Sequence, residues 1–293
     1  MAAAASYIET KKEKKSSKKR NRIIAEVISQ IVLIILSIMA LFPFIWMVTS
    51  SLKSNAEIFQ YPPKLLPEVP RWKNYVDAVV SVNFGRGFLN SIKLTLINTF
   101  GQVLTASMAG YALGKLKFRG SEQVFAGFIA VMMVPYTVIV IPLFVMLNKV
   151  GLINTHLGII LMTFGYMPMG VFMCRQFIMS LPNDLFDAAL IDGASYGKIY
   201  FSLVLPLIKP AVASLAIFAF LWNWNSYFTP MIFLTSQEKY TVPLLLQMFK
   251  GKHSADWSLI MAASTISVLP SLVTYLFGQR YIIEGIAITG MKG

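Results

Sequence analysis

Charged residues are scarce in this sequence, and cysteine and histidine are nearly absent. Of the 293 residues, 13% are charged and 56% are hydrophobic, whereas a soluble domain carries about 25% charged residues. The low charge excludes an ordinary soluble domain and favours a protein that crosses a membrane several times.

The single cysteine, Cys174, and the two histidines, His156 and His253, are too few for a disulfide framework, a metal cluster or a Cys/His dyad. An enzyme within the membrane would also need carboxylates that converge inside the apolar segments, and those segments contain almost none. We therefore expect no catalytic residues and no metal ligands, and we do not expect the chain to be an enzyme.

Two stretches, Gly110–Leu116 and Gly193–Ile199, superficially match a phosphate-binding loop. Each has three residues between its glycines where four are needed, and neither lysine is followed by serine or threonine. The chain itself is therefore expected to bind neither ATP nor another cofactor.

Six apolar segments are long enough to cross a bilayer, which needs about 20 residues for each helix. The second is the weakest, because Lys93, Asn98 and Gln102 interrupt it. We therefore predict an all-α polytopic membrane protein with six transmembrane helices, at residues 26–48, 88–113, 123–147, 157–178, 203–222 and 258–278.

Proline interrupts two of these segments, the third at Pro135 and Pro142 and the fifth at Pro206 and Pro210. Such breaks are tolerated in a membrane where neighbouring helices or a cavity satisfy the freed backbone groups. They indicate either a translocation path or irregular helix packing.

Residues 1–22 contain eight Lys and Arg residues against two glutamates, a net charge of +6. The composition is typical of a disordered cytoplasmic tail that fixes orientation. Nucleic-acid binding would need a folded module beside this tail, and none is visible, so no nucleic acid is expected as a partner. An even number of helices then places both termini in the cytoplasm and residues 49–87 and 223–257 outside.

The outer segment 49–87 holds four prolines together with Trp72 and Tyr75. It either meets an external partner or simply connects two helices through interfacial aromatic anchors.

A polar hairpin, residues 182–206, lies between the fourth and fifth apolar segments, on the predicted cytoplasmic side. Asn183 or Asp184 can cap a short helix, Gly193 permits a tight turn, and a second helix begins near Ser195. The hairpin is either a docking element for a partner or a surface turn between two spans.

The hairpin closely resembles the signature of ATP-binding-cassette importer permeases: Glu-Ala-Ala, two residues, Asp-Gly-Ala, and Leu-Pro twelve residues later. The only departure is an aspartate in place of the usual glutamate. The matching residues are Asp187-Ala188-Ala189, Asp192-Gly193-Ala194 and Leu205-Pro206.

The resemblance extends from about residue 40 to the end of the chain. It is to the six-span permease of carbohydrate importers, similar to the maltose-transporter subunit whose tail reaches the ATPase interface. Many relatives have an acid where this chain has Ser226. The further matching stretches are Phe44-Ile45-Trp46, 51–59, Phe88-Leu89-Asn90-Ser91, Trp224-Asn225, Gly285 and 290–293.

The resemblance implies a subunit of an importer in the cytoplasmic (inner) membrane of a prokaryote, carrying a di- or oligosaccharide. Its partners would be a second permease, an ATPase homodimer that binds ATP and Mg, an external solute-binding protein and the surrounding lipid. The implied parts are a basic tail at 1–22, a first helix and outer loop at 23–87, a transmembrane core at 88–282 and a cytoplasmic tail at 283–293.

The resemblance also implies which residues meet the ATPase. Asp187, Asp192 and Gly193 would anchor and shape the coupling helix, and Ala188, Ala189 and Ala194 would form its close-packed face. The other residues expected at this interface are Pro206 and, in the tail, Gly290, Lys292 and Gly293.

For the solute path we expect Asn98, Gln102, Tyr136 and Asn225, because polar groups at membrane depth are often functional. Helix–helix hydrogen bonding is the competing explanation for each of them. The alternative function is a stand-alone secondary transporter, which would usually show internal repeats and buried ionisable residues; neither is visible. The basic residues of the outer loop suit an acidic saccharide or ordinary surface charge equally well.

Overall fold

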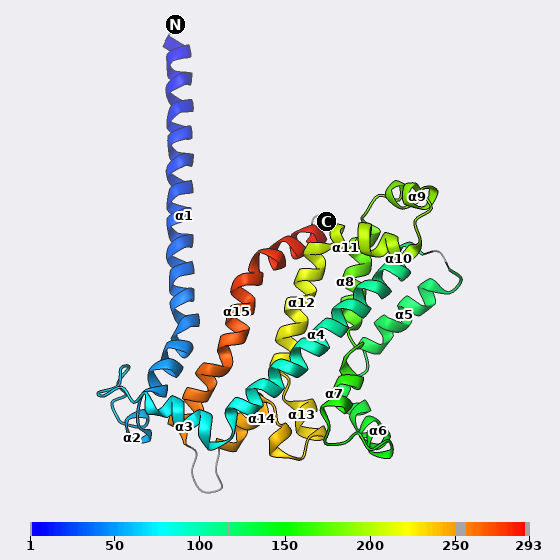
Figure 1. Cartoon of the computed structure of the whole chain (residues 1–293). Helices are drawn as coiled ribbons and strands as arrows, with labels where there is room; N and C mark the ends of the chain where they lie inside the picture. Colours follow the sequence, from blue (N-terminus) through cyan, green and yellow to red (C-terminus); the bar gives the residue numbers. More distant parts are fainter. Residues whose placement is uncertain (1, 117, 250–255, 291–293) are drawn as a thin grey trace.

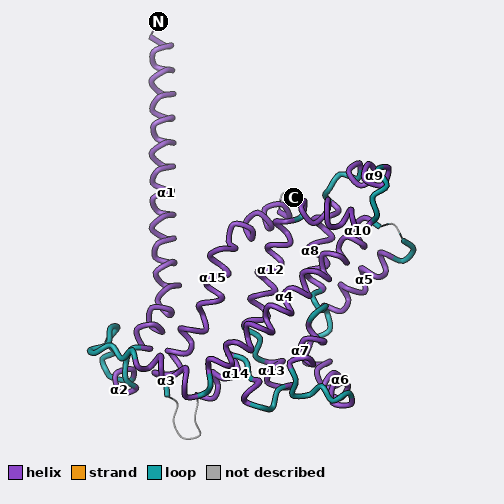
Figure 2. Tube along the Cα trace, in the orientation of Figure 1, coloured by secondary structure: helices purple, strands orange, loops and turns teal. Residues whose placement is uncertain are grey.

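The computed structural model describes residues 2–116, 118–249 and 256–290, with the backbone alone for 2–22 and 283–290. Within these ranges the chain is built from helices joined by loops, a long one at residues 59–72, and contains no strand (Figures 1 and 2). The predicted all-α class is confirmed.

The first half of the chain holds the long N-terminal helix and the helices around the first two breaks. These are α1 (Ala2–Ser51), α2 (Asn55–Ile58), α3 (Lys73–Ser81), α4 (Phe84–Lys115), α5 (Ser121–Met132), α6 (Tyr136–Lys149), α7 (His156–Thr163) and α8 (Pro168–Met179).

The second half holds the hairpin, the fifth apolar segment and the C-terminal helix. The elements are α9 (Asp184–Ile191), α10 (Tyr196–Ile199), the π-helix η1 (Tyr200–Val204), α11 (Leu205–Leu207), α12 (Lys209–Trp224), α13 (Phe228–Phe233), η2 (Gln237–Lys239), α14 (Val242–Leu246), η3 (Gln247–Phe249) and α15 (Trp257–Gly290).

Helix α1 stands apart from the body and packs against α15 near its Ser51 end (Figure 1). Its backbone is helical from Ala2, so the prediction of a disordered segment at 1–22 is wrong for the backbone of 2–22. The physical reason is local, because Ala, Lys and Glu are strong helix formers and neither Gly nor Pro occurs before Pro43.

Three helices of the described chain are long and apolar enough to span a membrane, namely Ile23–Ser51, His156–Met179 and Trp257–Ile282. Two further pairs qualify only if each bent pair is one span: α5 with α6, bent by 99°, and the helix before Ile208 with α12, bent by 82°. The predicted second span lies in α4, which falls short of the same test because polar residues interrupt it. The predicted count of six is therefore not confirmed.

Proline explains both bends. Pro135 directly precedes α6 in an extended conformation (φ −61°, ψ 133°), and Pro210 stands in the first turn of α12 just after the break at Ile208. A proline lacks the N–H that would continue the preceding helix and disfavours helical geometry in the residue before it. Pro142 lies inside α6 without ending it, contrary to the expected break.

The main hydrophobic core lies between α4, α8 and the fifth segment, and includes Tyr111, Cys174, Ile178, Val204 and Leu215. Gly110 makes the close approach of α4 to α8 possible. A Cβ placed on it would lie 2.7 Å from the Cys174 Cβ and 2.9 Å from the Arg175 backbone nitrogen. Small residues at helix contacts are the usual way to bring membrane helices together.

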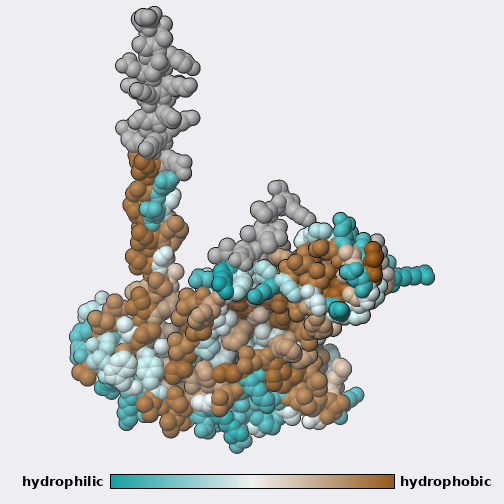
Figure 3. Space-filling model, turned by 45° about the horizontal axis from the view of Figure 1, so that its top comes forward, coloured by the Kyte–Doolittle hydropathy of each residue, from teal (hydrophilic) through white to brown (hydrophobic). Residues whose placement is uncertain are grey.

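The segment after α1 is folded back and held by buried hydrogen bonds. The Asn74 side chain donates to the carbonyl oxygens of Ser51 (2.8 Å) and Lys53 (2.9 Å), and Lys53 Nζ donates to the carbonyl of Lys64. Figure 3 shows hydrophobic residues across the side of the body, with hydrophilic residues gathered along its lower edge and at its right-hand tip. This distribution suits a body that sits in a bilayer.

The contact at Gly110 generates a stability prediction. Gly110→Ala should destabilise the protein by about 1–3 kcal/mol, because the new methyl group meets backbone atoms that have no room to move. The midpoint of thermal unfolding of the purified protein in detergent measures the effect.

Gly127→Ala is the matched control, since Gly127 also lies in a helix but has no atom within 4 Å of an added Cβ. It should be neutral or slightly stabilising, because Ala is the better helix former. Equal midpoints for the two variants would contradict the close contact between α4 and α8.

Candidate functional site: the α9 hairpin

Helices α9 and α10 form a hairpin that projects from one end of the molecule, between α8 and the fifth segment (Figure 1). Asp184 and Asp187 lie in the first turn of α9, where carboxylates interact favourably with the helix dipole. Asn183 precedes the helix without capping it, because its side chain makes a different contact, described below.

Gly193 makes the turn between the two helices. Its φ of +75° is in the left-handed region, as predicted. The amide of Ala194 donates to the carbonyl of Ala189 and that of Gly193 to the carbonyl of Leu190, both at 3.0 Å. This pair of bonds is the Schellman motif, which satisfies the last carbonyls of α9.

Phe186 and Lys115 fix α9 to the end of α4. The Phe186 side chain is buried and stacks on Tyr111 with ring centroids 6.4 Å apart. Lys115 Nζ lies 4.6 Å from the centroid of the Phe186 ring and donates to the carbonyl of Leu181 and to Asn183 Oδ1, both at 2.7 Å. The hairpin is therefore attached to the core by an aromatic stack, a cation–π contact and two charge-assisted hydrogen bonds.

Burial lowers the pKa of the Lys115 ammonium from its usual value, and the nearby Asp187 carboxylate offsets part of that shift. Neither Lys115 nor Phe186 is among the residues predicted for this interface. Phe186 is the one aromatic residue in the stretch 182–195, and that isolation was an available signal.

The outward face of α9 combines acids with exposed apolar side chains. Asp187, Ala188 and Asp192 are exposed, and the Ile191 side chain is 86% exposed. Leu185 and Leu190 of the same helix are exposed as well, and a group of exposed apolar side chains rimmed by polar residues is typical of a protein docking surface.

The three alanines expected on one face of the hairpin do not share a face in the structure. Ala188 faces outward, whereas Ala189 and Ala194 pack partly buried against the chain's own main core. Two of the three therefore hold the hairpin to its own chain.

The π-helix η1 follows the hairpin and leads to Leu205-Pro206. The amide of Leu205 donates to the carbonyl of Tyr200, five residues earlier. The Tyr200 hydroxyl lies 2.7 Å from Ser107 Oγ on α4. π-helical turns often mark functional positions in helices. Here the turn places Pro206 in α11, close to the 82° bend, and adds a second link from the hairpin to α4.

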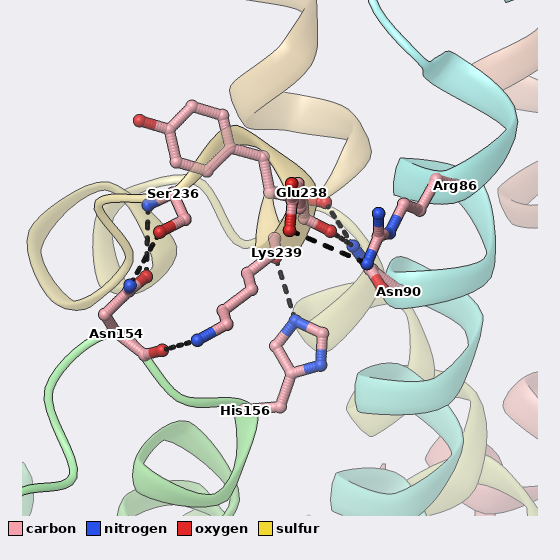
Figure 4. A network of polar contacts seen from close by, with 8 residues as sticks. Arg86, Asn90, Asn154, His156, Ser236, Glu238 and Lys239 are labelled. Atoms are coloured by element: carbon pink, nitrogen blue, oxygen red, sulfur yellow. Dashed lines mark hydrogen bonds and ion pairs between the residues drawn. The ribbon is translucent and has the colours of Figure 1, made fainter.

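A polar network closes the opposite end of the body (Figure 4). Asn90 on α4 donates to the carbonyls of Glu238 and Tyr240, both at 3.0 Å. His156 Nε2 lies 2.8 Å from the carbonyl of Lys239, whose Nζ donates to the carbonyl of Asn154 at 2.6 Å. The loop at 234–240 is thus tied to both α4 and the start of α7.

Of the four residues expected on the solute path, Asn98 lines a small pocket, and Gln102 and Tyr136 are hydrogen-bonded to residues that line it. Asn98 is 3% exposed. Tyr136 is partly buried, and its hydroxyl accepts a hydrogen bond from Thr229 at 3.2 Å. Asn225 is exposed, and its side chain donates to the carbonyl of Leu221 in its own helix.

Gln102 is buried and engaged in hydrogen bonds between helices. Its Nε2 donates to the carbonyls of Thr163 (3.0 Å) and Tyr166 (3.3 Å), and its Oε1 accepts from Asn223 Nδ2 at 2.9 Å. These contacts favour the competing explanation for Gln102, which joins α4 to α12 and to the segment between α7 and α8. Asn223, which is not among the four residues expected on the solute path, lines the same pocket as Asn98.

Gly290 is the last residue of α15, while Lys292 and Gly293 lie outside the described residues. Among the residues that are described, no group of three or more His, Cys, Asp or Glu side chains lies close enough together to hold a metal ion.

The family of binding-protein-dependent transport system inner membrane components matches this chain over residues 102–287. The chain belongs to this family. It is therefore an inner-membrane component of a binding-protein-dependent transport system, and the resemblance found in the hairpin is confirmed.

The permease is similar to two curated relatives over most of its length. This chain is 34% identical to the arabinooligosaccharides transport system permease protein AraQ of Bacillus subtilis (strain 168), over 88% of this chain and 92% of that protein. It is 33% identical to the diacetylchitobiose uptake system permease protein NgcG of Streptomyces coelicolor, over 87% of this chain and 85% of that protein.

A solved structure has the same fold. It is a bacterial ABC transporter involved in the import of the acidic polysaccharide alginate, and the permease matches one of its chains with a TM-score of 0.77 at 24% identity. The match covers 88% of this chain and 96% of that chain.

The anchor of α9 generates a second prediction. Lys115→Ala removes both hydrogen bonds to the start of the hairpin, worth about 0.5–1.5 kcal/mol each, and should accelerate amide hydrogen exchange in α9 by about 5- to 150-fold. Exchange measured by mass spectrometry on peptides that cover residues 182–195 checks this.

The control is Lys198→Ala, which removes the same charge from α10, where the side chain is exposed. Exchange in α9 should then stay close to that of the unmodified protein. Equal exchange in both variants would show that Lys115 does not hold the hairpin.

Proposed function

We propose that this permease is a subunit of an ATP-binding-cassette importer that carries a di- or oligosaccharide across the cytoplasmic membrane of a prokaryote. The observation that carries the proposal is the α9 hairpin, an exposed docking surface anchored to the core helix α4. Membership of a binding-protein-dependent transport family supports it, as do relatives named as permeases for arabinooligosaccharides and diacetylchitobiose.

The energy source in this proposal is a partner ATPase homodimer, which binds ATP and Mg. A groove on the ATPase takes the outward face of α9, with Asp187, Ala188 and Asp192 in contact and Gly193 holding the turn. The C-terminal tail, with Gly290, Lys292 and Gly293, meets the same partner. This chain contributes no catalytic residue and no cofactor ligand.

Closure of the ATPase on ATP then moves the hairpin, and the hairpin moves α4 and the bent fifth segment with it. The two permease subunits alternate between inward-open and outward-open forms, because the ATPase prefers one arrangement of the hairpins when ATP is bound. An external solute-binding protein delivers the saccharide at the opposite end, where the network of Figure 4 lies.

The orientation follows from the placement of the ends. The first residues of α1, the last residues of α15 and the α9 hairpin lie at the same end of the molecule (Figure 1). The basic tail at 1–22 favours the cytoplasm for that end. We infer that both termini and the hairpin are cytoplasmic.

Reconstitution tests this function. Proteoliposomes that contain the permease, its partner permease and the ATPase, with the solute-binding protein added outside, should import a labelled saccharide only when ATP is enclosed. Uptake that needs an ion gradient and no ATP would instead indicate a secondary transporter.

The Gly193 turn supplies the variant for this assay. Gly193→Val forces a β-branched residue to positive φ, which costs about 1–2 kcal/mol or more and should lower ATP-driven uptake about 5- to 30-fold. Gly197→Val is matched, since both glycines have open space around an added Cβ and only Gly193 has positive φ. If both variants transport equally well, the turn is not part of the coupling.

A further inference from the structure

A cleft lies at the hairpin end of the molecule, between the end of α4, the start of α5 and the end of α8 (Figure 1). Its volume is about 280 Å³, close to the lower limit of roughly 300 Å³ that is usual for pockets that hold small organic ligands. The charged residues among its described lining are Lys115, Arg175 and Glu122. Two positive charges against one negative charge leave the lining with a net charge of +1.

Arg175 is a buried cation with free hydrogen-bond donors. Its side chain is 8% exposed, and its guanidinium lies 4.0 Å from the centroid of the Phe125 ring. Nε donates to the carbonyl of Leu113 at 3.0 Å, and one Nη donates to the Glu122 carboxylate at 2.5 Å. The other three of its five N–H donors have no hydrogen-bond partner among the described residues.

The free donors of Arg175 open into the cleft. The second Nη atom makes no hydrogen bond to the described residues, yet it is not one of the fully enclosed polar atoms, so water can reach it. Because Arg175 lines the cleft, that accessible surface faces it. A buried guanidinium is stabilised by anionic acceptors, and here one acceptor position is open.

Lys115 adds a second positive charge on the α4 side of the cleft. Both of its hydrogen bonds go to uncharged oxygens, the carbonyl of Leu181 and Asn183 Oδ1. The ion pairs of the described residues do not include Lys115. Asp187, whose charge acts on the pKa of Lys115, lies on α9 and does not line the cleft.

Helix α5 begins at the cleft, because its first two residues, Ser121 and Glu122, line it. Gly120 precedes the helix at φ +91°, and no side chain caps it. The free amides at the start of a helix attract anions. Glu122 already lies in this field, but its side chain is 71% exposed, so its ion pair with Arg175 is weak and an incoming anion competes with it.

A phosphate group suits this combination of donors. Its oxygens accept from a guanidinium and an ammonium on different helices at once, and arginine binds phosphate through paired N–H groups. Basic pockets between membrane helices are typical sites for the head groups of anionic lipids. Apolar side chains that suit the chains of a lipid lie beside the cleft: Phe118, Val124 and Met179 are 44%, 48% and 49% exposed.

We propose that this cleft binds a phosphate group, with Arg175 donating hydrogen bonds to it and Lys115 contributing charge. The exposed apolar side chains favour an anionic phospholipid as the source of that group, and inorganic phosphate offers the same chemistry from solution. A bound phosphate joins α4, α5 and α8 beside the hairpin. The inference goes beyond the proposed function, and its test needs neither ATP nor solute.

The test uses the complete transporter, purified in a neutral detergent and titrated separately with three probes. These are dioleoylphosphatidylglycerol, dioleoylglycerol, which has the same chains without the phosphate, and inorganic phosphate. Amide hydrogen exchange in peptides that cover residues 118–126 reports binding at the cleft. Phosphatidylglycerol at ten times its Kd should slow this exchange by up to about 10-fold, and dioleoylglycerol should not slow it.

Two changes at the start of α5 should shift the affinity in opposite directions. Ser121→Glu adds a negative charge to the lining and should raise the half-saturating concentration about 2- to 5-fold, whereas Glu122→Gln removes the acid and should lower it by a similar factor. A gain in affinity cannot come from damage to the fold. Gln123→Glu is the matched control, since it adds the same charge in the same turn at an exposed residue that does not line the cleft. Its half-saturating concentration should stay close to that of the unmodified protein.

Arg175→Gln tests the principal donor directly. It should raise the half-saturating concentration about 10-fold or more, the loss of one charge-assisted hydrogen bond. Should this buried variant fail to assemble, the two α5 variants decide. The same pattern with inorganic phosphate alone would support the site and assign its ligand to solution.

Three results would overturn the proposal. These are protection by dioleoylglycerol equal to that by phosphatidylglycerol, no protection by either phosphate probe, and equal affinities in Ser121→Glu and Glu122→Gln.

Discussion

The attachment of α9 to the end of α4 is the interaction on which the rest of this structure depends. A projecting helix of eight residues cannot be stable alone, because short isolated helices are marginal in water. Phe186 and Lys115 stabilise α9 by joining the hairpin to the core. The Schellman turn at Gly193 fixes the direction of the chain from α9 into α10. The outward face is left free for a partner.

Helix α4 connects the features that the proposed function needs. Its 32 residues make it about 48 Å long. Lys115 holds the hairpin at one end, Asn98 lines the pocket further along, and Asn90 joins the network at the other end. Lys93, Asn98 and Gln102 keep α4 below the hydropathy of an ordinary span. Helix α4 is therefore a single stiff element through which a displacement of the hairpin reaches the pocket.

Features that depend on local sequence were predictable. The left-handed turn follows from Gly193 with its neighbours, and the breaks at 135 and 210 follow from proline, because both effects act within a few residues. The positions of the straight spans follow from the length of their apolar runs. The helical backbone at 2–22 was missed although it too is local, since net charge outweighed helix propensity in the prediction.

Features that depend on contacts between distant segments were not predictable. Nothing near Phe186 indicates that its ring meets Tyr111, 75 positions earlier in the chain. Polarity alone placed Gln102 and Asn98 in one class, whereas the structure gives Gln102 partners on other segments and leaves Asn98 Oδ1 without one among the described residues. The size of the bends at the two breaks likewise depends on packing.

The central claim is that the outward face of α9 receives the motion of an ATPase. Ile191 is 86% exposed and the one native cysteine, Cys174, is buried, so Ile191→Cys offers a single reactive thiol. Photocrosslinking from benzophenone maleimide on this cysteine, in the assembled transporter, should yield an adduct with the ATPase subunit. Tyr61→Cys, 92% exposed at the other end, should yield none. No adduct from Ile191→Cys in a transporter that still imports its solute, or an ATPase adduct from Tyr61→Cys, would contradict the account.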